Sequence, residues 1–202
     1  MEFLEVSNIS ISFHNNKVFE NFSYKFSPGV TIIKGKNGIG KSTLLSILSS
    51  TTRPDSGTIK CCIDGQNKPF KIIEHGNFVP DKPDFYDFIT TKEFLKLMNN
   101  LKGLSFDLEE SVLFDEFKLQ KHLYTPFDAL SIGTKKKVFL LVALISPAPV
   151  IILDEPTNSL DDESNTVLIK HIKRNVQAGA IIIMSSHDTN FTNTFNANII
   201  DL

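Results

Sequence analysis

The sequence predicts an α/β fold with a mostly parallel β-sheet, an antiparallel β subdomain at the N-terminal end and a helical insertion in the middle. In the second half of the chain, short runs of β-branched and other apolar residues alternate with segments of helical length. Such continuous apolar runs are typical of strands in a parallel sheet that helices cover on both faces. The length fits a single domain over residues 1–202.

The N-terminal part predicts strands of two kinds. Apolar and polar residues alternate over residues 3–11 and 18–26, which predicts an antiparallel pair with a turn at residues 14–16. Residues 30–34 form a β-branched run that predicts a buried strand, and a Gly-rich loop and a helix over residues 42–50 follow it directly.

The middle of the chain, from about residue 88 to 145, is expected to form a helical subdomain. Residues 91–98 and 108–119 have the apolar spacing of amphipathic helices. The remaining expected elements are a strand over 58–63, a helix over 135–145, a strand over 150–153, a helix over 163–179, and strands over 180–185 and 198–202.

Composition argues against several classes of protein. With 41% hydrophobic and 22% charged residues, the chain has the balance of a soluble globular protein. It has no apolar run long enough to span a membrane, and residues 1–5 lack the pattern of a signal peptide, so we expect a cytoplasmic protein. The net charge of −2 gives no overall attraction to nucleic acid, so we expect no nucleic-acid partner. Cys61 and Cys62 are expected to be buried thiols in a reducing compartment.

A phosphate-binding motif occupies residues 35–42, where Gly-Lys-Asn-Gly-Ile-Gly-Lys-Ser has the spacing of a P-loop. Its glycines let successive backbone N–H groups face a phosphate, and the following helix adds its N-terminal dipole. Lys41 would neutralise the β- and γ-phosphate oxygens of ATP, and the Ser42 hydroxyl would bind Mg²⁺. The predicted nucleotide-binding residues of this segment are Asn37, Gly38, Gly40, Lys41, Ser42 and Thr43.

Two carboxylates follow the predicted strand at residues 150–153. Asp154 and Glu155 would emerge at its C-terminal end, where ligands bind in open α/β sheets. Asp154 would hold Mg²⁺, and Glu155 would polarise the water that attacks the γ-phosphate. Together with the P-loop, this pair predicts an ATPase.

The P-loop, Asp154-Glu155 and three further segments make five motifs. They follow one another along the chain in the same order as in the ABC (ATP-binding cassette) ATPases, which have a P-loop NTPase core, and they resemble the motifs of that family. Residues 130–134, Leu-Ser-Ile-Gly-Thr, are similar to the family's signature loop. Residues 156–161 match its Pro-Thr segment and D-loop, and residues 185–188, Ser-Ser-His-Asp, resemble its H-loop. The resemblance extends over essentially the whole chain.

The resemblance implies that two cassettes pair head to tail, with each ATP between one P-loop and the signature loop of the other cassette. Ser131 and the backbone N–H of Gly133 would then reach the γ-phosphate bound by the second cassette. His187 would contact the γ-phosphate and help to hold Glu155 and the attacking water. Phe13 occupies the place of the family's adenine-stacking aromatic, although a phenylalanine could equally belong to the core.

The chain departs from the family pattern at three positions. Ile132 replaces the first glycine of the signature, and a β-branched residue cannot take backbone angles that only glycine adopts. Thr134 replaces the usual glutamine of the signature. In the Q-loop, Asp81 stands where a glutamine normally contacts Mg²⁺ and the attacking water, so it would either bind the metal or cap the following turn.

Two further clusters lie beside these motifs. Residues 135–137 are three lysines at the start of a predicted helix, and we expect them to form a solvated face. An aromatic cluster follows the Q-loop, where transporters of this family receive a short helix from the membrane subunit, and core packing is the alternative. Its members are Phe85, Tyr86, Phe88 and Phe94.

The expected function is that of an ATP-binding and ATP-hydrolysing subunit that energises a membrane transporter, with ATP and Mg²⁺ as its ligands. The expected partners are an integral-membrane transporter subunit, which would hold the chain at the inner face of the cell membrane, and a second ATPase cassette. One alternative is a soluble ABC protein that acts on ribosomes or nucleic acid. The other is a nucleotide-gated module that hydrolyses ATP weakly.

Overall fold

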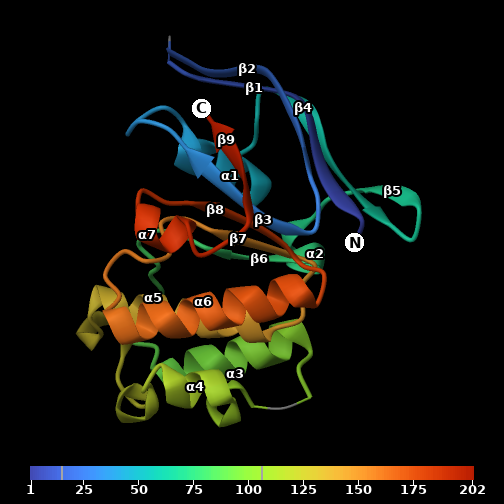
Figure 1. Cartoon of the computed structure of the whole chain (residues 1–202). Helices are drawn as coiled ribbons and strands as arrows, with labels where there is room; N and C mark the ends of the chain where they lie inside the picture. The colour runs from blue at the N-terminus through green and yellow to red at the C-terminus, as the bar shows by residue number, and fades with distance from the viewer. Residues whose placement is uncertain (15, 106) are drawn as a thin grey trace.

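The computed structural model describes residues 1–14, 16–105 and 107–202 (Figure 1). Asn15, in the predicted turn, and Phe106, in the predicted helical subdomain, lie outside the described residues. Among the residues that are described, none of the helices combines the length and apolar character needed to cross a membrane.

The larger sheet has five strands in the order β6-β7-β8-β3-β9, and every neighbouring pair is parallel. Its strands are β3 (Gly29–Lys34), β6 (Gly76–Val79), β7 (Val150–Leu153), β8 (Ile181–Ser185) and β9 (Ala197–Asp201). The predicted mostly parallel sheet is therefore confirmed. Strand β6 was not expected, because its four residues begin with Gly76 and Asn77, which disfavour strands, and it forms only by pairing with β7.

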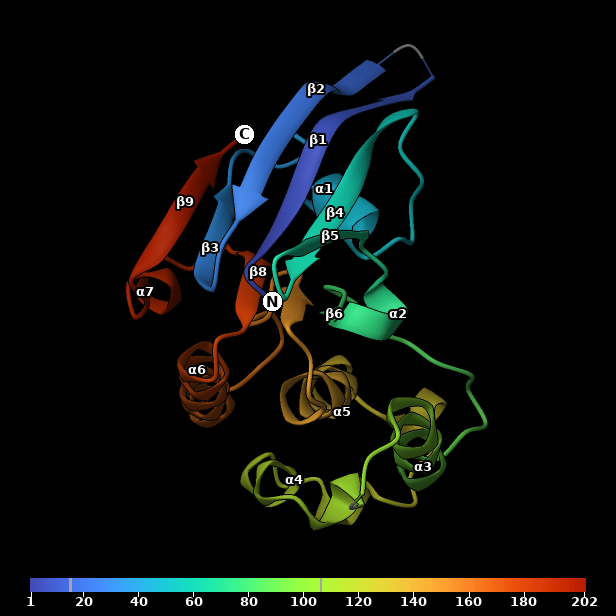
Figure 2. The same ribbon diagram turned by 90° about the vertical axis from the view of Figure 1, so that its right-hand side faces the viewer.

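The N-terminal strands form a separate antiparallel sheet in the order β2-β1-β4-β5, as the alternating pattern predicts. Its strands are β1 (Phe3–Phe13), β2 (Asn16–Phe26), β4 (Ser56–Ile63) and β5 (Gln66–Pro69). Helix α1 (Lys41–Leu48) lies between the two sheets (Figures 1 and 2). Its buried leucines share one apolar cluster with residues of both sheets, which fixes the P-loop at the start of α1 against the N-terminal strands. Cys61 and Cys62 on β4 are both buried and free, as expected.

The other face of the parallel sheet carries α5 (Ile132–Ile145) and α6 (Asp162–Gln177) (Figure 2). Further from the sheet lie α3 (Thr91–Lys102) and α4 (Val112–Glu116), with short helices α2 (Ile72–His75) and α7 (Thr189–Thr192) at the edges. Short 3₁₀ turns at Leu108–Glu110, Gln120–His122 and Phe127–Ala129 complete the helical region.

The predicted helix over residues 108–119 is wrong as a single element. Ser111 divides it into a 3₁₀ turn and α4, because its backbone is extended and its hydroxyl accepts a hydrogen bond from the Phe114 N–H. A serine in this position competes for the backbone N–H groups of the next turn and so begins a new helix instead of continuing the old one.

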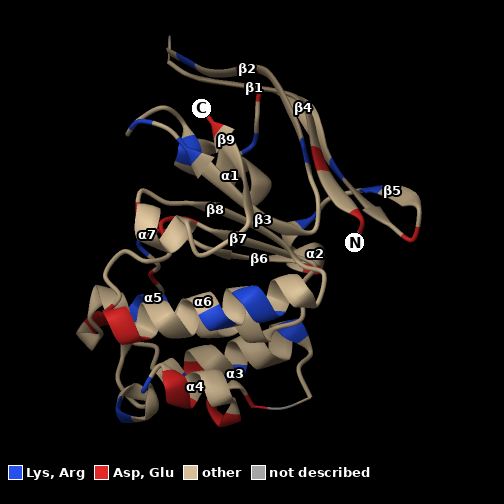
Figure 3. Cartoon of the chain, in the orientation of Figure 1, with Lys and Arg blue, Asp and Glu red and all other residues tan. Residues whose placement is uncertain are grey.

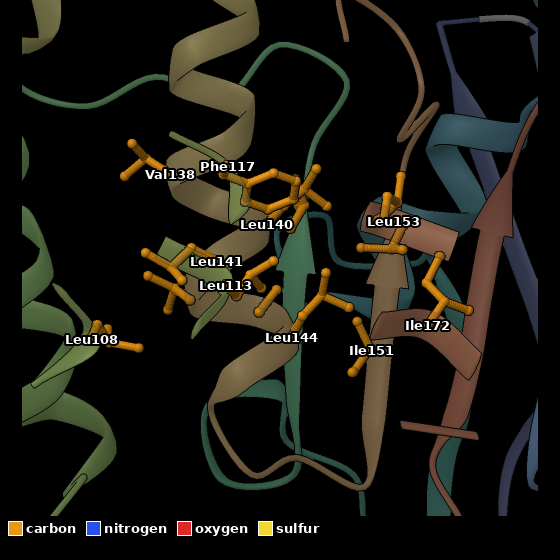
Figure 4. Packing of buried hydrophobic residues seen from close by; sticks show 14 of the residues in the cluster. Leu108, Leu113, Phe117, Val138, Leu140, Leu141, Leu144, Ile151, Leu153 and Ile172 are labelled. Atoms are coloured by element: carbon orange, nitrogen blue, oxygen red, sulfur yellow. The ribbon is translucent and has the colours of Figure 1, made fainter. Parts of the chain in front are cut away.

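The main core lies between the helical layer and the parallel sheet. Figure 4 shows Leu140, Leu141 and Leu144 of α5 facing the side chains around Leu113 and Ile151. All five of these side chains are buried, and they connect the outer helices to the strand that is followed by Asp154 and Glu155. The position of α5 is thereby set relative to the end of β7.

Candidate nucleotide-binding site

One cleft of about 860 Å³ gathers most of the predicted site residues, a volume in the usual range for ligand pockets. It is lined by residues from the end of β1, the P-loop, the loop after β6 and the loops after β7 and β8. The predicted residues at the cleft are Phe13, Asn37, Gly38, Gly40, Lys41, Ser42, Thr43, Asp81, Glu155 and His187.

The P-loop is held in a tight turn at the start of α1. Gly40 caps the helix with φ 118°, and a Cβ atom there would lie 2.6 Å from Cγ1 of Val18, so only glycine fits. The Lys41 side chain folds back over the loop, where Nζ donates to the carbonyls of Gly35 at 2.9 Å and Lys36 at 3.2 Å. A buried ammonium at a helix N-terminus is a suitable arrangement for a phosphate.

Phe13 ends β1 at the rim of the cleft, and 47% of it is exposed. The alternative that Phe13 belongs to the core is therefore wrong. Its ring is available to a ligand in the cleft, and its stacking on adenine remains a prediction.

Asp154 and Glu155 are joined to the neighbouring strand by Ser185. The buried Ser185 hydroxyl donates to Oδ1 of Asp154 at 2.6 Å and accepts from the backbone N–H of Glu155 at 3.0 Å. One hydroxyl at the end of β8 thus fixes both residues at the end of β7. Asp154 itself is 6% exposed and is not among the residues that line the cleft, whereas Glu155 is.

His187 lies directly beside Glu155. The His187 backbone N–H donates to Oε2 of Glu155 at 3.2 Å, and its Nε2 lies 3.5 Å from Oε1 of the same carboxylate. Glu155 has φ 42°, an uncommon backbone angle for a residue with a side chain. Such angles persist where the surroundings hold them, and here the bond from the Glu155 N–H to Ser185 and the bond from the His187 N–H to the Glu155 carboxylate supply that support.

Asp81 reaches the cleft from the loop after β6. Its Oδ1 accepts a hydrogen bond from the Asn158 side-chain amide at 2.8 Å, which ties the Q-loop to the segment after Glu155. Asn158 was not predicted as a site residue. Its position three residues after Glu155 was visible in the sequence, but its bond to Asp81 depends on the pairing of β6 with β7.

Ser131 and Gly133 do not line this cleft. They lie at the start of α5 beside a second cavity, together with Ser159 and Asp161. The Ser131 hydroxyl accepts from the Thr134 N–H at 3.1 Å and so caps α5. A Cβ atom on Gly133 would lie 2.3 Å from the Ser159 carbonyl oxygen, so the second signature glycine is required by contact with the D-loop.

Ile132 needs none of the backbone angles that only glycine adopts. It is the first residue of α5, and it is not among the described residues with positive φ. The side chain is 54% exposed and therefore fits without strain at the position where the family has its first glycine.

The prediction that residues 135–137 form a solvated face is wrong. Lys135 Nζ lies 2.6 Å from Oδ1 of Asp84, and Lys137 Nζ lies 2.9 Å from Oδ2 of Asp161. Lys136 is 0% exposed, and burial lowers the pKa of its ammonium to about 8. Three like charges can be held close together here because each one faces a different acceptor.

The oxygen ligands that the cleft offers fit a magnesium ion. Ser42 and Asp81 present a hydroxyl and a carboxylate at the cleft surface, and Ser185 orients the buried Asp154 carboxylate nearby. Hydroxyl and carboxylate oxygens are the donors that Mg²⁺ prefers beside nucleotide phosphates. Magnesium binding by these three residues remains a prediction.

Comparison with known proteins shows the family of the chain. A family model described as ABC transporter matches residues 19–158. The chain belongs to the ABC transporter family. Its relatives include the cytochrome c biogenesis ATP-binding export protein CcmA of Reclinomonas americana, which is 33% identical over 95% of this chain and 89% of CcmA. The ABC-type transporter ATP-binding protein EcsA of Bacillus subtilis is 28% identical over 93% of this chain and 78% of EcsA.

A solved ATP-binding subunit of an ABC transporter has the same fold. The similarity covers 99% of this chain and 85% of that one, with a TM-score of 0.86 and 26% sequence identity. The predicted family and the P-loop fold are therefore confirmed, and the protein is an ABC-type ATPase.

Proposed function

We propose that this ABC-type ATPase is the ATP-hydrolysing subunit of a membrane transporter whose membrane spans lie in a separate protein. The observation that carries the proposal is that Glu155, with His187 beside it, shares one cleft with Lys41 of the P-loop. The cleft therefore joins a phosphate-binding cation to a carboxylate that can orient water. In this proposal residues 1–202 act as one ABC ATPase domain, with a helical subdomain at about residues 88–145.

Each residue of the cleft would have one task in hydrolysis. The P-loop backbone and Lys41 would bind the phosphates of ATP, and Phe13 would stack on the adenine. Ser42, Asp154 and Asp81 would hold Mg²⁺, which supplies positive charge beside the phosphates when bound. Glu155 would accept a hydrogen bond from the attacking water and orient it, and His187 would keep the Glu155 carboxylate in place.

A second cassette would complete the site. Ser131 and Gly133 lie outside the chain's own cleft, at the N-terminus of the 14-residue helix α5. In a head-to-tail pair they would face the γ-phosphate on the other cassette, where a helix N-terminus stabilises negative charge. The pair would be either a homodimer or a heterodimer.

The membrane subunit would dock in an apolar groove between α2, α3 and the Q-loop. Ile73, Phe78, Phe85 and Met98 line it, and 78% of Ile73 is exposed. Of the aromatic cluster after the Q-loop, Phe85 and the largely buried Phe94 line the groove, whereas Tyr86 and Phe88 are exposed and are not among its lining residues. A short helix of the membrane subunit would cover this surface and hold the chain at the cytoplasmic side of the membrane.

Charge supports a protein partner over a nucleic acid. Acidic and basic residues are interspersed along the chain (Figure 3), and the net charge of −2 gives no overall attraction to nucleic-acid phosphates.

The test is affinity purification of the tagged chain from detergent-solubilised membranes, followed by ATPase measurement on the reconstituted complex. We expect an integral-membrane protein to co-purify and to change the rate of phosphate release. Ile73→Ser should abolish the association, whereas Val112→Ser should leave it intact, because Val112 is another exposed β-branched residue that lies on α4, away from the groove. Association with ribosomes in place of a membrane protein would refute the proposal.

A further inference from the structure

Lys136 is a fully buried lysine that the proposed chemistry does not use. It lies in the first turns of α5, five residues after Ser131. Burying an ammonium group costs several kcal/mol unless each of its N–H groups donates to an acceptor. That cost is comparable to the whole free energy of unfolding of many small domains. A lysine at a fully buried position of the main core therefore calls for a specific set of partners.

Those partners are three backbone carbonyls near the cleft. Nζ donates to the oxygens of Pro80 at 3.0 Å, Asp81 at 2.9 Å and Asp154 at 3.0 Å. An ammonium group has three N–H donors, so all of them are used. The Asp81 carboxylate lies further away, at 3.9 Å. The side chain thus holds main-chain atoms, and it leaves the Asp81 carboxylate to its bond with Asn158.

The three carbonyls belong to two adjacent strand ends. Pro80 and Asp81 follow β6, Asp154 follows β7, and the two strands pair through Val79 and Leu153. Lys136 therefore joins the carboxyl ends of both strands to the helix that begins at the signature loop. Its neighbours on α5 extend the connection, with Lys135 bound to Asp84 and Lys137 to Asp161.

We propose that Lys136 is a positioning residue for ATP hydrolysis, which fixes the main chain at Asp81 and Asp154 relative to helix α5. A displacement of the signature end of α5 would then be transmitted to the Q-loop and to the carboxylates at the end of β7. This inference rests on the proposed hydrolysis at the cleft. It predicts that loss of the Lys136 ammonium misplaces the catalytic groups and leaves the P-loop intact, because none of the contacts made by its ammonium involves residues 35–43.

The decisive variant is Lys136→Met, which keeps the unbranched stem and removes the three donors. Lys136→Gln is the conservative variant, because its amide restores N–H donors without the charge. Lys102→Met is the matched control, since Lys102 is half-buried and its Nζ donates at 3.1 Å to the carbonyl of Gly76, at the opposite end of β6. The control removes the same type of bond from the same strand, at the apolar groove and away from the nucleotide cleft, so all variants are compared as the isolated chain.

Two experiments test whether loss of the Lys136 ammonium misplaces the catalytic groups and loosens the Q-loop. The first compares kcat with the Kd for MgATP from isothermal titration. The second uses Lys82→Trp as a reporter of the Q-loop, because the chain has no tryptophan and Lys82 is exposed next to Asp81. Acrylamide quenching of that tryptophan reports how firmly the loop is held.

We expect Lys136→Met to lower kcat by about 30-fold, about 2 kcal/mol in activation free energy, with the Kd for MgATP changed by less than about threefold. Quenching of the reporter should rise in Lys136→Met, Lys136→Gln should recover most of kcat, and Lys102→Met should match the wild type in kcat, in the Kd for MgATP and in quenching. An unchanged kcat, or a loss of kcat without any change in quenching, would overturn the proposal. If the wild type itself hydrolyses no ATP, the proposed hydrolysis fails, and the quenching comparison alone decides whether Lys136 fixes the loop.

Discussion

Ser185→Ala tests whether one buried hydroxyl fixes both carboxylates at the end of β7. The substitution removes the 2.6 Å bond to the Asp154 carboxylate and the 3.0 Å bond from the Glu155 N–H. A hydrogen bond to a charged group contributes about 1.5–3 kcal/mol and a neutral one about 0.5–1.5 kcal/mol. We therefore expect the free energy of unfolding to fall by about 2–4.5 kcal/mol, the sum of the two bonds, because the Asp154 carboxylate is buried and water cannot replace the lost hydroxyl.

Urea unfolding at neutral pH measures this loss directly. For a chain of this size it corresponds to a fall in Tm of about 2–4 °C per kcal/mol. Ser186→Ala is the matched control: Ser186 is also buried, but its hydroxyl accepts a neutral bond from the Asp188 N–H at 3.1 Å, so its loss should lower the free energy of unfolding by about 0.5–1.5 kcal/mol. If Ser185→Ala costs no more than Ser186→Ala, the hydroxyl does not hold the two carboxylates and the reasoning is wrong.

Three further predictions concern the nucleotide site. Glu155→Gln should keep MgATP binding and abolish turnover, because it preserves shape and removes the charge that orients water; an unreduced rate of phosphate release would exclude Glu155 as the catalytic carboxylate. Lys41→Ala should weaken ATP binding in isothermal titration, and unchanged affinity would contradict the role of the P-loop cation. If Asp81 binds Mg²⁺, Asp81→Asn should shift the Mg²⁺ dependence of ATPase activity to higher concentration, whereas superimposable titration curves would remove Asp81 from the metal site.

The apolar runs of the sequence predicted the parallel sheet because strands buried on both faces carry no polar alternation. The predicted strand over residues 150–153 has the same bounds as β7, Val150–Leu153, and all four of its side chains are buried. Strand β6 was missed because Gly76–Val79 has no such run and depends on a partner strand for its conformation. Ser111 was missed as a helix break because a capping serine and a serine on a helix surface look alike in a sequence.

The motifs predicted which residues meet at the cleft, but the sequence did not reveal the hydrogen bonds that hold those residues in place. Ser185 belongs to the H-loop motif, yet its bonds to Asp154 and Glu155 arise only when β8 pairs with β7. The prediction for residues 135–137 is wrong because a run of three lysines does not reveal which acceptors their ammonium groups contact in the fold. The carbonyls that accept from Lys136 lie 18 to 56 residues away in the chain.

Two of the departures from the family pattern, Ile132 and Asp81, have different physical consequences for the site. Ile132 stands where the backbone is helical, so its side chain adds bulk to the surface without strain in the signature loop. Asp81 is different, because it places a carboxylate in the same cleft as Glu155 and already bonds to Asn158. A cation among the phosphates would offset that negative charge, whereas without one Asp81 would repel ATP. A reduction in hydrolysis that originates at Asp81 should therefore diminish as the Mg²⁺ concentration rises.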